Sequence, residues 1–210
     1  MANIFIIDNQ ELSREGLKRV LEGIEDIRIV GETNDATGLL EDIKSVQCDV
    51  VVLEIGLPDQ SGLEIMRRLR RLCPKARCIV FSEHPESRYA LRAIRAGAFG
   101  YLTKDASKGQ IVEAIRKVAK GEYSISGPLL KQIVRILVDH PPELPHERLS
   151  NREFEILRYL AVGKTTRKIA SDLNLRANSV ATYKSRIFKK LRISSISELT
   201  RYALEKDLVD

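Results

Sequence analysis

The sequence predicts two domains: an α/β domain with a doubly wound parallel sheet of five strands, and a smaller all-α domain of four helices. Two observations carry this prediction. Short apolar runs alternate with helical apolar spacing in the first 121 residues, whereas only helical spacing is visible after residue 149. Repeated strand-then-helix units build a parallel sheet with right-handed crossovers, because each helix returns the chain to the same sheet edge.

Five apolar runs mark the predicted strands, at 4–7, 27–30, 50–53, 78–81 and, more weakly, 101–102. The first, third and fourth runs are nearly continuous in apolar residues. Such continuity is typical of parallel strands that helices cover on both faces.

Each predicted strand is followed by apolar residues at helical spacing. The helical sets are Leu17, Val20, Leu21 and Ile24; Ala36, Leu39, Leu40 and Ile43; Ile65, Leu69 and Leu72; Ala90, Leu91 and Ile94; and Ile111, Ile115 and Val118. Ser107 and Gln110 have the spacing of a capping box, which predicts where the last of these helices begins.

The predicted organisation is a first domain at 1–121, a linker at 122–148 and a second domain at 149–210. Within the linker, residues 128–138 have the pattern of a short helix. Pro141, Pro142 and Pro145 then predict an extended segment, because proline lacks a backbone N–H and has a fixed φ. The four helices of the second domain are marked by the capping pair Ser150 and Glu153, by Thr166, by Leu191, and by the pair Ser195 and Glu198.

The excess positive charge lies entirely in the second domain. Residues 148–210 hold 14 Lys and Arg against 7 Asp and Glu, a net charge of +7, whereas the first 147 residues hold 21 against 22, a net charge of −1. A near-neutral body with a basic end favours a polyanionic partner for that end. A solvated basic surface is the alternative.

Several classes of protein are disfavoured. Cys48, Cys73 and Cys78 are odd in number and lack metal-binding spacing, so we expect buried, reduced thiols. No run of 18 apolar residues occurs, and an acid follows the N-terminus too soon for a signal peptide, so we expect a cytoplasmic protein without a membrane span. No Ser-His-Asp arrangement, phosphate-binding glycine loop or metal cluster is visible, so we expect no enzyme.

Polar residues directly follow four of the predicted strands: Asp8 with Asn9, Glu54, Ser82 and Lys104. In a doubly wound sheet these positions converge in the crevice beyond the carboxyl ends of the strands. Oxygen-rich sites of this kind suit magnesium and a phosphoryl group. The alternative is that these residues only cap strand ends.

Four segments carry a family resemblance: IFIIDNQELSREGL, VVVLEIGLPDQSGLE, CIVFSEH and AGAFGYLTKDAS. They resemble the receiver domains of two-component response regulators of the NarL/FixJ type, and the resemblance covers nearly all of residues 1–121. It implies the strand order 2-1-3-4-5. It also implies that Asp8 is the first acid of the phosphorylation pocket, that Lys104 is its lysine, and that Ser82 and Tyr101 are the switch residues.

Three positions depart from the family pattern. Asn9 stands where the family has a second metal-binding acid, Glu54 stands where it has the phosphorylated Asp, and Glu83 stands where a small residue admits the phosphodonor. The pocket then carries a charge of −1 in place of −2, so the resemblance implies that Asp8 and Asn9 bind Mg²⁺ weakly or not at all. The extra methylene of Glu54 advances its carboxylate by roughly 1.5 Å.

These departures support the hypothesis that Glu54 is not phosphorylated. Its carboxylate would either mimic the phosphorylated state or lock one fixed state through a charge-assisted contact with Lys104. The alternative is a degenerate pocket that does not switch.

The third helix of the second domain has two faces. One is apolar, with Val180, Tyr183, Ile187 and Leu191; the other has Asn178, Ala181, Thr182, Ser185 and Lys189, flanked by Lys184, Arg186 and Lys190. Small polar side chains with cations beside them fit the DNA major groove, where cations bind phosphates. An ordinary surface helix is the alternative.

The segments LSNREFEILRYLAVGKTTRKIASDLNL and ANSVATYKSRIFKKLRISS are similar to LuxR/FixJ-type helix-turn-helix domains. The resemblance covers 149–210 and implies a recognition helix at 178–191 and a scaffold helix at 166–173. Implied base-edge residues are Ala181, Thr182 and Ser185, and implied phosphate contacts are Thr166, Arg167, Ser179, Lys184, Arg186 and Lys189. Arg176 replaces a usual capping Ser, so this helix needs another cap.

Members of this family bind DNA half-sites as dimers, so the resemblance implies a homodimer. The fourth helix, with Ile196, Leu199 and Ala203, is the implied dimer face. The alternative is that this stripe packs in the core of its own domain.

We therefore predict a transcription regulator that binds double-stranded promoter DNA without needing phosphorylation of Glu54, with control from a partner protein at the receiver surface, from expression level or from heterodimerisation. Two alternatives remain. One is a conventional kinase-controlled regulator with residual phosphotransfer. The other is an adaptor that does not bind DNA and sequesters a related regulator.

Overall fold

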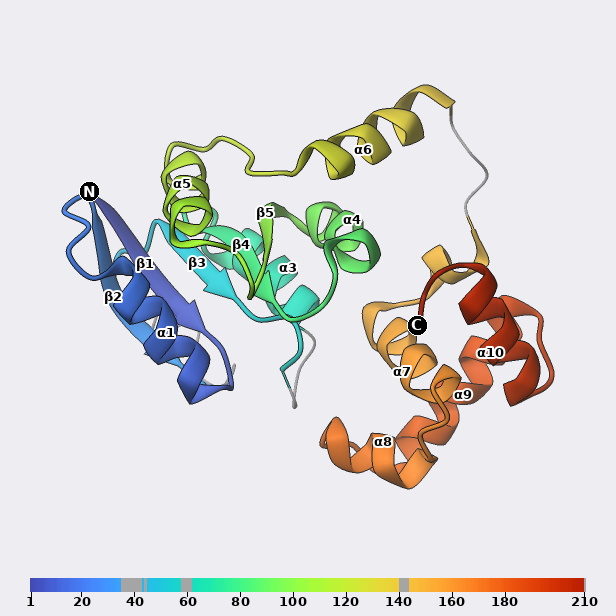
Figure 1. The fold of residues 1–210 in the computed structure, drawn as a ribbon. Coiled ribbons are helices and arrows are strands. Elements are labelled where there is room, and N and C mark those ends of the chain that lie inside the picture. Colours follow the sequence, from blue (N-terminus) through green and yellow to red (C-terminus); the bar gives the residue numbers. More distant parts are fainter. Residues whose placement is uncertain (35–42, 44, 58–61, 140–143, 210) are drawn as a thin grey trace. The chain divides into compact units, whose positions relative to one another are not determined.

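The computed structural model describes residues 1–34, 43, 45–57, 62–139 and 144–209. The chain divides into two compact units, Met1–Asp139 and His140–Asp210 (Figure 1). The predicted helix around Ala36 to Ile43 lies, except for Ile43, outside the described residues, as do Pro141 and Pro142 of the linker.

The first unit is built on a parallel sheet in the order β2-β1-β3-β4-β5, which confirms the predicted fold. Its strands are β1 (Ala2–Ile7), β2 (Ile27–Thr33), β3 (Val50–Leu53), β4 (Arg77–Ser82) and β5 (Ala98–Thr103). Ile7 pairs with Leu53, and Leu53 pairs with Val80, so the three central strands end at nearly the same level. This register brings the residues that follow the strands to one edge of the sheet.

Helices cover both faces of this sheet, as the continuous apolar strands predict. They are α1 (Glu11–Leu21), α3 (Gly62–Leu72), α4 (Glu86–Ala96) and α5 (Lys108–Ala119). Ile4 and Ile6 of β1 pack in a buried cluster with residues of α1 and α5. The alternate residues Phe5 and Ile7 are buried on the opposite face, because successive strand residues point to opposite sides.

Helix α6 (Gly127–Asp139) confirms the predicted connecting helix, and it packs against α4 within the first unit. Leu129 at its start is buried. The first part of the predicted linker, up to Asp139, therefore belongs to the first unit.

Helices are the only regular elements among the described residues of the second unit. Its elements are the 3-10 turn η1 (Pro145–Arg148), α7 (Asn151–Ala161), α8 (Thr166–Asp172), α9 (Ala177–Leu191) and α10 (Ile196–Glu205). Ser150 forms the predicted capping box with Glu153, and the Ser195 hydroxyl accepts from the backbone N–H of Glu198. Arg176 makes no side-chain cap of α9. The buried His146 of η1 contacts the Tyr202 hydroxyl of α10 at 3.0 Å, so the end of the predicted linker packs on the second unit.

We expect Ile4→Ala to lower the free energy of unfolding of the first unit by about 2–5 kcal/mol. Ile4 has no exposed area, and truncation leaves a cavity between β1, α1 and α5. Urea unfolding followed by circular dichroism measures the loss. Leu12→Ala is the control, since Leu12 is 86% exposed. Equal effects of the two substitutions would contradict this account of the core.

Candidate functional site

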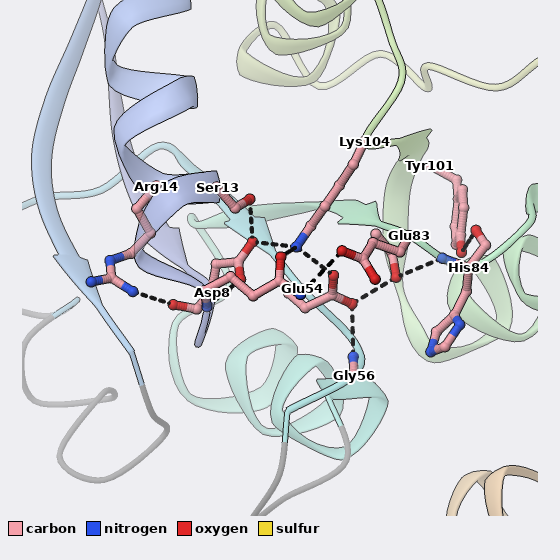
Figure 2. A network of polar contacts seen from close by, with 11 residues as sticks. Asp8, Ser13, Arg14, Glu54, Gly56, Glu83, His84, Tyr101 and Lys104 are labelled. Carbon is pink, nitrogen blue, oxygen red and sulfur yellow. Dashed lines mark hydrogen bonds and ion pairs between the residues drawn. The ribbon is translucent and has the colours of Figure 1, made fainter. Parts of the chain in front are cut away.

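Four predicted site residues meet at the carboxyl edge of the sheet. Asp8 follows β1, Glu54 follows β3, Ser82 ends β4 and Lys104 follows β5. We call these four residues the acidic pocket (Figure 2). The side chains of Asp8, Glu54 and Ser82 are buried, so their polar atoms depend on partners within the protein.

The Glu54 carboxylate is held on both oxygens. Its Oε1 accepts from the Ser82 hydroxyl at 2.6 Å and from the backbone N–H of Gly56 at 2.8 Å. Its Oε2 lies 3.1 Å from Lys104 Nζ. The geometry thus places the Glu54 carboxylate within reach of both Ser82 and Lys104, as its length predicts.

Lys104 bridges the two acids of the pocket. Its Nζ lies 2.9 Å from Asp8 Oδ2 and 3.1 Å from Glu54 Oε2, and it donates to Gln10 Oε1 at 3.1 Å. Burial by itself would lower the pKa of Lys104, but the bonds and charges of Asp8 and Glu54 outweigh it and raise this pKa above its ordinary value. The ammonium therefore stays charged at neutral pH and neutralises part of the charge of the acids.

Asp8 is fixed by two further donors. The backbone N–H of Gln10 donates to its Oδ1 at 2.9 Å, and the Ser13 hydroxyl donates to its Oδ2 at 2.6 Å. The Gln10 side chain also donates to Glu83 Oε1 at 3.1 Å. Sequence reasoning missed Gln10 and Ser13; their signal was position, since both lie at the start of the helix that follows Asp8.

The pocket does not fit a divalent cation well. The Lys104 ammonium occupies the space between the two carboxylates that would have to supply ligands. Asn9 is exposed, and among the described residues no group of three or more His, Cys, Asp or Glu could hold a metal ion. Magnesium needs several oxygen ligands in near-octahedral geometry, so we derive no chemistry through it.

Tyr101 is buried beside the pocket and connects to it through His84. Its hydroxyl donates to the His84 backbone carbonyl at 2.8 Å, and the His84 N–H donates to Ser82 Oγ at 3.3 Å. Burial raises the pKa of Tyr101, and the charge of Glu54 adds to this, so the phenol keeps its proton and remains a donor. The two predicted switch residues, Ser82 and Tyr101, therefore meet at one peptide segment.

Helix α9 has the two faces that its sequence predicts. Val180, Ile187 and Leu191 are buried, and Tyr183 is half-buried. The predicted DNA-contacting residues are more open to solvent. Exposed are Asn178, Ala181, Thr182, Ser185, Arg186 and Lys189 on α9 and Arg167 on α8; half-buried are Ser179 and Lys184 on α9 and Thr166 on α8.

Some polar groups of this unit have structural partners. The Thr182 hydroxyl donates to the Asn178 carbonyl at 3.0 Å, and Lys184 Nζ lies 5.3 Å from the centre of the Phe188 ring. Lys190 Nζ lies 2.6 Å from the buried carboxylate of Glu153 and joins α9 to α7. We therefore assign Lys190 to packing of the unit.

The implied dimer face on α10 requires correction. Leu199 and Ala203 have no exposed area, because they pack in the core of their own unit. They are not available to a second chain, and only Ile196 keeps a half-buried side chain. For Leu199 and Ala203, the alternative prediction of packing in the core of their own domain is confirmed.

The response regulator receiver domain family matches residues 4–116, and the family of bacterial regulatory proteins of the luxR type matches residues 147–203. The chain belongs to the response regulators with a LuxR-family DNA-binding domain. No helix in the described part of this response regulator combines the length and apolar character needed to cross a membrane.

Known response regulators match the chain over nearly its whole length. The chain is 32% identical to the response regulator UvrY of Escherichia coli K12 over 209 residues, covering 99% of this chain and 96% of the relative. It is 32% identical to the response regulator GacA of Pseudomonas aeruginosa over 211 residues, covering 100% and 99%. A structure of RcsB from Salmonella typhimurium shares the fold with a TM-score of 0.69 at 24% identity, covering 96% of each chain.

We expect Lys104→Met to lower the free energy of unfolding by up to about 3–5 kcal/mol. Without the ammonium, the buried carboxylates of Asp8 and Glu54 lose their counter-charge. The double variant Lys104→Met/Glu54→Gln should recover part of this loss, because one of the two charges is removed. Chemical denaturation of the three proteins tests this; a double variant less stable than Lys104→Met alone would refute the charge balance.

Proposed function

We propose that this response regulator is a sequence-specific DNA-binding transcription regulator whose output does not require phosphorylation at position 54. One observation carries the proposal: the Glu54 carboxylate holds Ser82, the Gly56 N–H and Lys104 at 2.6, 2.8 and 3.1 Å. The family resemblance places the phosphorylated Asp at this position and the phosphate-sensing groups at Ser82 and Lys104.

The proposal depends on two hydrogen-bond donors, the Ser82 hydroxyl and the Lys104 ammonium. A phosphoryl group attached at position 54 would need the hydroxyl of Ser82 and the ammonium of Lys104 as partners for its oxygens. Here the longer side chain of Glu54 already satisfies both donors with its own carboxylate. Phosphorylation of Glu54 would have to break both bonds before a phosphoryl group could use these donors.

The surroundings of the pocket support the same proposal. The exposed side chain of Gln10 accepts from Lys104 and donates to Glu83, so it links the pocket lysine to the acid at the atypical position 83. Because Lys104 lies between Asp8 and Glu54, the pocket is a weak magnesium site at most. A phosphodonor thus meets neither a free acceptor nor the usual metal.

The proposed output is binding of promoter DNA in the cytoplasm. RcsB, a protein of the same fold, has been solved bound to the promoter rprA, at 22% identity and a TM-score of 0.63. In this chain the exposed small residues of α9, Ala181, Thr182 and Ser185, allow close approach to base edges. Arg167, Arg186 and Lys189 are exposed cations that can pair with phosphates.

We further propose that the regulator binds DNA as a homodimer and takes its signal from a partner protein at the receiver surface. Dimeric helix-turn-helix proteins read two half-sites, which doubles the number of base contacts. Because Leu199 and Ala203 are enclosed, a dimer contact on α10 would have to use its exposed residues, such as Arg201 and Leu204.

Incubation with acetyl phosphate and magnesium, followed by intact mass measurement, tests phosphorylation independence. We expect no phosphoryl adduct on the wild-type chain. Glu54→Asp is the matched variant, because it restores a shorter carboxylate at the same position. An adduct on the wild type that disappears in Glu54→Gln would overturn the proposal in favour of conventional kinase control.

Salt dependence of promoter binding tests the DNA interface. We expect Lys189→Ala to weaken binding and to reduce the slope of log K against log salt by about 0.9, the value for one lost phosphate contact. Lys108→Ala, an exposed cation of the first unit, is the control and should leave the slope unchanged. If the wild-type chain shows no binding to any promoter in genome-wide mapping, the adaptor alternative holds instead.

A further inference from the structure

Ser126 joins two helices of the first unit at their N-termini. Its hydroxyl donates to Glu86 Oε2 at 2.7 Å and accepts from the backbone N–H of Leu129 at 3.2 Å. Its carbonyl accepts from the N–H of Leu130 at 2.9 Å. Ser126 therefore caps α6 and, through the same hydroxyl, holds it to the first residue of α4.

A second contact ties the approach to α6 to the edge of the sheet. The Ser124 N–H donates to the Phe99 carbonyl at 2.7 Å, and Ser124 forms a parallel bridge with Gly100 in β5. A Cβ on Gly100 would lie 2.8 Å from the Ser124 carbonyl oxygen, so the glycine permits this approach. The segment before α6 is thus paired with the strand that carries Tyr101.

A second set of contacts starts at Glu54 in the acidic pocket and reaches His84. Glu54 accepts from the Ser82 hydroxyl at 2.6 Å, and the N–H of His84 donates to that same hydroxyl at 3.3 Å. The Tyr101 hydroxyl donates to the His84 carbonyl at 2.8 Å. Figure 2 shows Tyr101 beside His84, and Glu54 between His84 and Asp8. Only Pro85 separates His84 from Glu86.

We propose that Ser126 is a positioning residue. It fixes the start of α6 in a position that depends on the hydrogen bonds made by Glu54. The route runs from Glu54 through Ser82 and the His84 peptide to Glu86, and then through the Ser126 hydroxyl to the first turn of α6. Tyr101 holds the His84 peptide in place. This route ends at α6, the last described helix before the second unit.

Proximity alone does not establish coupling, so the test is a double-mutant cycle on the full chain. Hydrogen exchange of the Leu129 and Leu130 amides is measured in the wild type, Tyr101→Phe, Ser126→Ala and the double variant. Ser126→Ala removes the cap and should speed exchange by roughly 5- to 30-fold. Tyr101→Phe removes the bond to His84 and should speed it by about 2- to 10-fold. The double variant should exchange no faster than Ser126→Ala alone.

Two further variants separate positioning from general destabilisation. Ser126→Thr keeps the hydroxyl and should retain the wild-type exchange rate. Asp26→Asn breaks the ion pair of Asp26 with Arg116, elsewhere in the same unit, and should leave the α6 amides unchanged. If the effects of Tyr101→Phe and Ser126→Ala multiply in the double variant, or if Asp26→Asn speeds α6 as much as Tyr101→Phe does, the proposal is overturned.

Discussion

The Lys104 ammonium between the carboxylates of Asp8 and Glu54 is the interaction on which the functional edge of the first unit depends. Without it, two buried acids at the ends of adjacent strands would repel each other. With the ammonium in place, every oxygen of both carboxylates has a charged or hydrogen-bonding partner. A polar network that is satisfied in this way is rigid, because any single rearrangement exposes a buried charge.

This rigidity gives a physical basis for the proposed mode of control. In the proposed function, Glu54 supplies permanently the contacts that a transferable phosphate would supply for a limited time. The switch residue Ser82 is then always engaged, and Tyr101 is buried against the His84 carbonyl. Regulation would have to enter through groups outside the acidic pocket, such as the Ser126 hydroxyl, which donates to Glu86 at the start of α4.

The two faces of α9 differ in their exposure to solvent. Buried Val180, Ile187 and Leu191 hold α9 in the core, whereas its opposite face stays open to solvent. The neighbouring lysines Lys189 and Lys190 also differ in their contacts. Lys190 is bound to Glu153, while Lys189 beside it is exposed. The proposed DNA contacts lie on the solvent-exposed face of α9.

Local signals in the sequence were enough to predict the order of the elements. These signals are apolar periodicity and capping pairs such as Ser107–Gln110 and Ser150–Glu153. It also placed Asp8, Glu54, Ser82 and Lys104 at one edge, since parallel strands of similar length end together. Which side chains meet became clear only from the folded protein. Lys104 lies between two acids, and Gln10 joins it to Glu83. Leu199 and Ala203 belong to the core, and Ser126 joins Glu86. Side-chain length and direction set these contacts between residues far apart in the chain, and no local pattern records them.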